Sequence, residues 1–114
     1  NMLFNTDISI ALKNFQGFYD LETFSIFETN KISENFTSLE IKNCNKIISF
    51  KVRCPHCGKY HSYKYSINEF IKKDLIVGGC EILGLPLFYM GDYNKVNKRV
   101  SRYNNINKQL YAMI

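Results

Sequence analysis

Polar and apolar residues alternate along several short stretches in the first two thirds of the chain. Alternation with a period of two is typical of β-strands that bury one face. Four stretches show this pattern, at residues 21–28, 37–42, 46–53 and 59–65. Asn43-Cys44-Asn45 separates the second stretch from the third and predicts the turn of a hairpin. Residues 75–90 are mostly apolar with a break at Gly84-Leu85-Pro86, which predicts buried strands over residues 75–77 and 87–90.

The spacing of apolar residues lengthens to three and four in the last quarter of the chain, which predicts an amphipathic helix. Asp92 can cap this helix, and its recurring apolar positions are Tyr93, Val96, Val100, Tyr103, Ile106, Leu110 and Met113. We expect burial of Val96, Val100, Tyr103 and Leu110. The other face carries Lys95, Lys98, Arg99, Arg102 and Lys108, which we expect to point to solvent or to a partner.

Two other segments have a helical interpretation. Ser66 is followed three residues later by Glu69, and this capping box predicts a short helix over residues 67–73. Residues 7–16 fit two patterns: Ile8, Leu12 and Phe15 form a helical stripe, and Ile8, Ile10 and Leu12 alternate as in a strand. We favour the helix there.

These elements predict an α+β fold in one domain spanning residues 1–114. We expect an antiparallel sheet of four to five strands, with a zinc knuckle at one end and the C-terminal amphipathic helix packed on it. The chain has 114 residues and is 46% hydrophobic, which suits a globular domain with a real core.

Nothing near the N-terminus resembles a signal peptide, and no apolar segment is long enough to span a bilayer. We therefore expect a cytoplasmic protein. The richness in Lys, Asn and Ile is typical of an AT-rich genome, such as that of a low-GC bacterium or its phage. Thiols stay reduced in the cytoplasm, so the four cysteines indicate metal binding or free thiols rather than disulfides.

The clearest chemical motif is Cys54-Pro55-His56-Cys57-Gly58. Two thiolates separated by two residues can reach one metal ion when the backbone turns tightly, and the following glycine tolerates the left-handed conformation of such a turn. The motif resembles the zinc knuckle of zinc-ribbon proteins, whose pattern Cys-Pro-x-Cys-Gly it matches in full. The resemblance covers five residues, and the second Cys-x-x-Cys pair usual in zinc ribbons is absent.

The other ligands of a zinc ion must come from elsewhere in the chain. His61 follows the motif closely, and Cys80 comes after a flexible Gly78-Gly79 approach, so the predicted ligands are Cys54, Cys57, His61 and Cys80. An ordinary buried thiol at Cys80 and a surface position for His61 are the alternatives. Cys44 should lie roughly 30 Å away along a strand, and His56 should point to solvent. Four protein ligands would make the zinc structural.

Charge is unevenly distributed along the sequence. Residues 1–50 hold four lysines against six acidic residues, a net of −2, whereas residues 51–114 hold eleven basic residues against four acidic ones, a net of +7. A basic C-terminal half indicates an anionic partner, either nucleic acid or an acidic protein surface. The candidate partner-binding residues are Lys95, Arg99 and Arg102 on the last helix and Lys59 and Lys64 near the knuckle.

These features favour a non-catalytic binding protein over an enzyme. In general character the chain is similar to small phage-encoded anti-CRISPR proteins that carry a structural metal, which implies an inhibitor of a nucleic-acid-handling complex. The alternative is a zinc-ribbon module that binds DNA or RNA directly. A third reading is a thiol-disulfide oxidoreductase that uses Cys54 and Cys57, but this chemistry needs the dithiol at a helix N-terminus.

Overall fold

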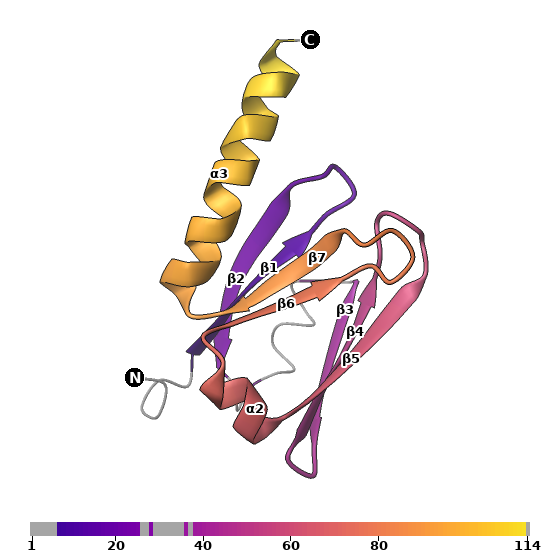
Figure 1. The fold of residues 1–114 in the computed structure, drawn as a ribbon, viewed down its shortest axis with the longest axis vertical. Helices are drawn as coiled ribbons and strands as arrows, with labels where there is room; N and C mark the ends of the chain where they lie inside the picture. Colours follow the sequence, from indigo (N-terminus) through magenta and orange to yellow (C-terminus); the bar gives the residue numbers. More distant parts are fainter. Residues whose placement is uncertain (1–6, 26–27, 29–35, 37, 114) are drawn as a thin grey trace.

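The computed structural model describes residues 7–25, 28, 36 and 38–113, and this part of the chain contains two antiparallel sheets (Figure 1). The strand order is β2-β1-β7-β6 in the four-stranded sheet and β3-β4-β5 in the three-stranded sheet. The elements are β1 (Asp7–Lys13), β2 (Tyr19–Ser25), β3 (Leu39–Cys44), β4 (Ile47–Arg53), β5 (Tyr60–Ser66), α2 (Ile67–Lys72), β6 (Leu75–Gly79), β7 (Pro86–Gly91) and α3 (Tyr93–Ala112).

The fold has three layers, with α3 against one face of the four-stranded sheet and the three-stranded sheet against the other (Figure 1). The main core lies between the two sheets and includes Ile10, Phe50 and Phe88. A smaller cluster beneath α3 contains Ala11, Tyr19, Val96 and Val100. The fold is therefore mixed α and β, as expected, but the expectation of one sheet of four to five strands is wrong. Helix α2 carries the chain from β5 in one sheet to β6 in the other.

The helix expected over residues 7–16 is also wrong, because Asp7–Lys13 forms strand β1. This strand lies inside the sheet, between β2 and β7, and is covered on both faces. Ile10 contributes to the core between the sheets while Ala11 contributes to the cluster under α3. Burial on both faces removes the polar positions that would mark strand alternation. Phe15, which completed the helical stripe, is 66% exposed in the β1–β2 loop.

The remaining strands follow their predictions closely. The β3–β4 hairpin turns at Asn45 and Lys46, whose φ angles are 51° and 62°. Two consecutive positive φ angles are typical of the two-residue turns that join antiparallel strands. The turn predicted around Cys44 is therefore present, displaced slightly along the chain. Residues 26, 27 and 37 of the predicted strands lie outside the described residues.

Ser66 is the N-cap of α2 as predicted, but the Glu69 side chain contacts the Ser66 hydroxyl rather than its backbone N–H, so the capping box forms only in part. Ser66 Oγ accepts a hydrogen bond from the backbone N–H of Glu69 at 3.1 Å, and its hydroxyl donates to the Glu69 carboxylate at 3.2 Å. These contacts satisfy one of the backbone N–H groups that a helix N-terminus leaves free. The short helix can therefore begin directly where β5 ends.

Helix α3 contacts the sheet along its N-terminal part, as far as Asn104. Val96 and Val100 are buried as predicted, whereas the predicted burial of Tyr103 and Leu110 is wrong, since they are 37% and 53% exposed. A helix of 20 residues is about 30 Å long, longer than the roughly 23 Å of a seven-residue strand. Its C-terminal end therefore stands clear of the sheet (Figure 1). Among the described residues, no helix combines the length and apolar character needed to cross a bilayer.

Candidate metal centre

The Cys54–Gly58 loop between β4 and β5 is a tight turn held by its own backbone. The N–H of Cys54 donates to the carbonyl of Lys59 at 2.8 Å, and the N–H of Gly58 donates back to the carbonyl of Cys54 at 2.9 Å. Gly58 has a φ angle of +77°, the left-handed conformation that the sequence predicted for it. The N–H of His56 donates to Cys54 Sγ at 3.3 Å, so the turn directs a backbone dipole at this sulfur.

The Cys80–Gly84 loop between β6 and β7 repeats this geometry. The N–H of Cys80 donates to the carbonyl of Leu85 at 2.8 Å, and the N–H of Gly84 donates to the carbonyl of Cys80 at 2.7 Å. Gly84 has a φ angle of +68°. The N–H of Leu83 donates to Cys80 Sγ at 3.4 Å. The two loops are therefore equivalent turns, and Leu83 stands where the first turn carries Cys57.

Sequence reasoning did not find this second turn. The shared spacing of a cysteine and a glycine four residues later, Cys54 with Gly58 and Cys80 with Gly84, was the available signal. This spacing was overlooked because a knuckle is recognised by its second cysteine. In the second turn, Leu83 stands where that cysteine would be. Backbone hydrogen bonds and a left-handed glycine are enough to form the turn without that cysteine.

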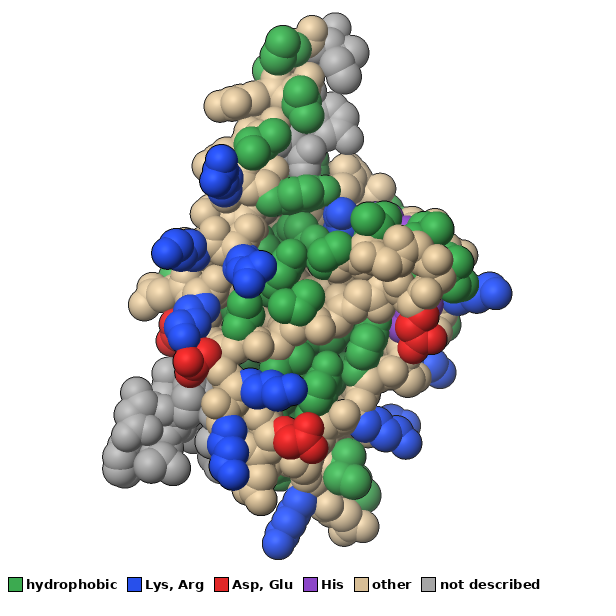
Figure 2. Space-filling model, in the orientation of Figure 1, with side chains coloured by type: hydrophobic (Ala, Val, Ile, Leu, Met, Phe, Trp, Pro, Cys, Tyr) green, Lys and Arg blue, Asp and Glu red, His purple; other side chains and the backbone are tan. Residues whose placement is uncertain are grey.

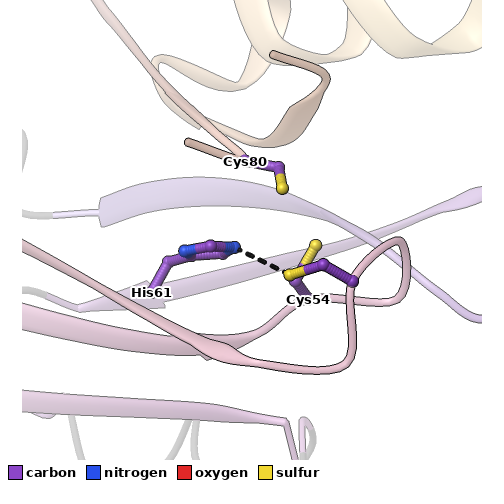
Figure 3. Close-up of side chains that lie close together, drawn as sticks. Cys54, His61 and Cys80 are labelled. Carbon is purple, nitrogen blue, oxygen red and sulfur yellow. Dashed lines mark hydrogen bonds between the residues drawn. The ribbon is translucent and has the colours of Figure 1, made fainter. Parts of the chain in front are cut away.

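The two turns bring together all four predicted ligands, Cys54, Cys57, His61 and Cys80. Their ligand atoms all lie within 4.8 Å of one another, and Figure 3 shows Cys54, His61 and Cys80 pointing toward a common centre. The Cys57 Sγ and His61 Nε2 atoms are 3.3 Å apart. Sulfur atoms around one tetrahedral zinc ion are about 3.8 Å apart. Three cysteines and one histidine could therefore hold a single metal ion, and we call these four residues the candidate metal centre.

The candidate metal centre is shielded from water. Cys54, Cys80 and His61 are buried, Cys57 is half-buried, and all three thiols are free. Burial raises the pKa of the Cys54 thiol. Burial alone would also raise the pKa of Cys80, but the backbone N–H groups of Leu83 and Ile82 and the neighbouring thiols lower it to about 7. Ionisation of a thiol is what metal binding requires, so the donor set suits a cation.

The other two candidate ligands lie outside this group. Cys44 is exposed at the turn end of β3, where it pairs with Ile47, far along the hairpin from Cys54. His56 does not point to solvent as predicted, because its Nε2 atom is buried and makes no hydrogen bond among the described residues. Burial, with a smaller effect from the charge of Lys13, lowers the pKa of His56. His56 is therefore not part of the group that could hold a metal ion.

The predicted partner-binding residues fall on two separate surfaces. On α3, Figure 2 shows basic side chains gathered along the helix. Four of them line a hollow of about 580 Å³ beside Asp74 and Leu75; we call Lys95, Lys98, Arg99 and Arg102 the helix surface. Within it, Lys95 Nζ lies 2.6 Å from a carboxylate oxygen of Asp74. Lys59 and Lys64 are exposed on the three-stranded sheet, and the structure does not bring them together with the helix surface.

No protein family matches the sequence, and neither a curated protein nor a solved structure shows significant similarity to it. The structure of the chain has two antiparallel sheets and a long C-terminal helix, with a Cys and His group that could bind a metal ion.

Proposed function

We propose that this is a non-catalytic binding protein whose fold is stabilised by one structural Zn²⁺ ion. The convergence of Cys54, Cys57, His61 and Cys80 supports this proposal most strongly. Three thiolates and one imidazole are a usual ligand set of structural zinc, and four protein ligands leave no position for a catalytic water.

The arrangement of Cys54 and Cys57 argues against thiol-disulfide exchange. Oxidoreductases of that kind place the dithiol at a helix N-terminus, where the helix dipole lowers the pKa of the attacking thiol. In this chain the two cysteines lie in a turn between strands β4 and β5. Burial raises the pKa of Cys54, which makes it a poorer nucleophile at neutral pH.

The proposed partner is a protein complex that handles nucleic acid and presents an acidic surface to α3. Lys98, Arg99 and Arg102 are exposed on one side of the helix and line its hollow, with Asp74 as the one acidic group there. This cluster of positive charge should speed the approach of an acidic partner and favour acidic partners over others. We further propose that binding inhibits the complex, as the general similarity to anti-CRISPR proteins implies.

Charge reversal at Lys95, Arg99 and Arg102 tests the helix surface. The triple change to Glu should abolish co-purification of a nucleic-acid-handling complex from a nuclease-treated bacterial lysate. It should leave folding almost unchanged, because exposed substitutions usually alter stability by about 0.5 kcal/mol or less. The matched control reverses the exposed Lys46, Lys72 and Lys73, which lie off α3, and should still capture the complex. Equal capture by both variants would exclude the helix surface as the interface.

Direct binding of DNA or RNA is the second candidate function. The observation that favours it lies on the three-stranded sheet, where Lys51 and Arg53 lie over two exposed aromatic rings, Tyr60 and Phe15. Cations beside exposed rings are the usual means of holding a single strand without reading its sequence.

A further inference from the structure

Among the described residues, no element packs on the face of the three-stranded sheet that is turned away from the core. Alternation along its strands turns residues such as Phe50 and Val52 inward, where they are almost fully buried. Tyr63 and Tyr65 are half-buried and pack against the same core. We define the outer sheet face by its outward residues, which are Glu40, Lys42, Ser49, Lys51, Arg53, Tyr60, Ser62 and Lys64.

The strand register gathers the charges of this face around two short side chains. Lys42, Ser49 and Lys64 form one row across the sheet, because Ser49 pairs with both lysines. In the next row, Lys51 pairs with Glu40 on one side and with Ser62 on the other. These six residues, together with Phe50 and Tyr63, line a hollow of about 200 Å³. With three lysines and two serine hydroxyl groups against one carboxylate, this lining suits a phosphate.

Two aromatic rings continue the face toward the candidate metal centre. Tyr60 is 54% exposed, and the ammonium group of Lys51 lies 5.1 Å from its ring centroid. Phe15 reaches the same end of the sheet from the β1–β2 loop, with the guanidinium group of Arg53 5.9 Å from its ring centroid. Each ring therefore has a cation beside it and much of its surface open to solvent. A base that stacks on one of these rings brings its phosphate near the neighbouring cation, so a nucleotide can contact the ring and the cation together.

The chemistry of the outer sheet face favours nucleic acid over a protein partner. Its four cations face one acidic group, Glu40, which gives a local net charge of +3. Lysine is depleted at the centres of protein interfaces, whereas phosphate binding depends on it. The exposed apolar groups of the face are flat rings. A duplex keeps its bases stacked inside, so open rings suit a single strand.

We propose that the outer sheet face binds single-stranded DNA or RNA. The phosphates lie in the hollow among Lys42, Lys51 and Lys64, and the bases stack on Tyr60 and Phe15. This inference rests on the second candidate function and supplies its interface. It does not depend on the protein partner proposed for the helix surface.

Fluorescence anisotropy with a labelled mixed-sequence single strand of about 15 nucleotides, as DNA and as RNA, tests the proposal. The double variant Tyr60→Ala and Phe15→Ala should weaken binding about 5- to 150-fold for each base that loses its stacking partner. Tyr93→Ala removes an equally exposed ring from α3 and should leave the affinity unchanged. Every variant is first shown to keep the metal content and melting temperature of the parent.

Salt dependence tests the phosphate contacts separately. The variant Lys51→Gln and Lys64→Gln should lower the slope of log affinity against log salt by about 1.4, since each lost contact to a single strand removes about 0.7. Lys98→Gln with Arg102→Gln on the helix surface should leave that slope unchanged.

Three results would overturn the inference, and they can be told apart. If nucleic acid binds but only the helix-surface variant weakens it, the outer sheet face is not the interface, while direct binding remains as a function. If the parent protein binds neither single strand nor duplex at low salt, both the inference and the second candidate function fail. Tighter binding of duplex than of single strand would exclude base stacking on Tyr60 and Phe15.

Discussion

The positions of the four residues in the candidate metal centre are set by the backbone around them. Cys54 and Cys80 each begin a turn that is closed by a left-handed glycine four residues later. His61 lies in β5, opposite Val52 of β4, where alternation directs its side chain toward the core. The ligand atoms are therefore brought together by turn geometry and strand register, which is the preorganisation that a structural metal site needs.

Replacement of one ligand should remove the metal and destabilise the domain severely. Cys57→Ser is expected to lose bound zinc, because structural zinc contributes an apparent 10–16 kcal/mol in small zinc-dependent folds, about as much as the whole stability of a typical domain. Cys44→Ser is the matched control, since this thiol is exposed and outside the metal group. Metal analysis and thermal unfolding measure both effects. Loss of zinc from the Cys44 variant would contradict the ligand assignment.

The equivalence of the two turns leads to a rescue experiment. His61→Ala should lower zinc affinity sharply, because it leaves three ligands. Adding Leu83→Cys should restore affinity, since position 83 corresponds to Cys57 and places a thiol where a two-knuckle site would have one. Ile82→Cys on the same background is the control and should not restore it. Competition with a chromogenic zinc chelator measures the affinities, and equal rescue at both positions would mean that the turns are not equivalent.

The sequence predicted which residues make up the candidate metal centre, but it did not predict that two equivalent turns carry them. Cys54 and Cys57 were found from a local motif, and His61 and Cys80 from their distance along the chain and the glycines before Cys80. The second turn was not found because Leu83 breaks the motif while leaving the backbone geometry intact. His56 was wrongly expected to face solvent because nothing in the local sequence shows that its Nε2 atom becomes buried.

At the scale of elements, α3 is joined to the sheet by a specific polar contact as well as by packing. The Asn104 side chain accepts a hydrogen bond from the backbone N–H of Tyr19 and donates one to its carbonyl, both at 3.0 Å. Tyr19 begins β2, which is an edge strand of its sheet among the described residues. The amide of Asn104 therefore continues the pairing of the edge and fixes the helix against it.

Asn104→Ala should loosen this attachment. Two backbone groups of Tyr19 lose their partner, which should cost about 1–3 kcal/mol. Asn105→Ala in the same helix is the control, because its side chain is exposed and the change in helix propensity is the same. Urea unfolding measures the difference, and hydrogen exchange should be faster in α3 of the Asn104 variant. Equal stability of the two variants would show that packing alone holds the helix.

Most elements could be predicted from residue periodicity, but their arrangement could not. The strands with one exposed face, such as β4 and β5, alternate clearly and were found. Strand β1 was taken for a helix because both of its faces are buried. Burial of the apolar stripe of α3 was expected as far as Leu110, although periodicity does not show where the sheet beneath a helix stops. Ile106 and Leu110 lie beyond that point and are exposed.

At the scale of the whole molecule, the candidate metal centre links the two sheets. Cys54, Cys57 and His61 belong to the three-stranded sheet and the turn that joins its strands, whereas Cys80 comes from the turn between β6 and β7 of the four-stranded sheet. One ion held by all four would tie the layers together at this end. Aromatic packing holds the interior, where Phe50 contacts both Phe70 and Phe88. A bound metal ion would therefore complete a core that hydrophobic contacts already define.

The metal content of the purified protein tests the central claim most directly. Protein prepared without chelator, under reducing conditions, should contain about one zinc ion per chain by mass spectrometry of the native protein and by elemental analysis. Removal of the ion should lower the melting temperature strongly, and added Zn²⁺ should restore it, because the ion binds the folded chain far better than the unfolded one. A folded protein that holds no metal, and whose melting temperature ignores both chelator and Zn²⁺, would contradict the account.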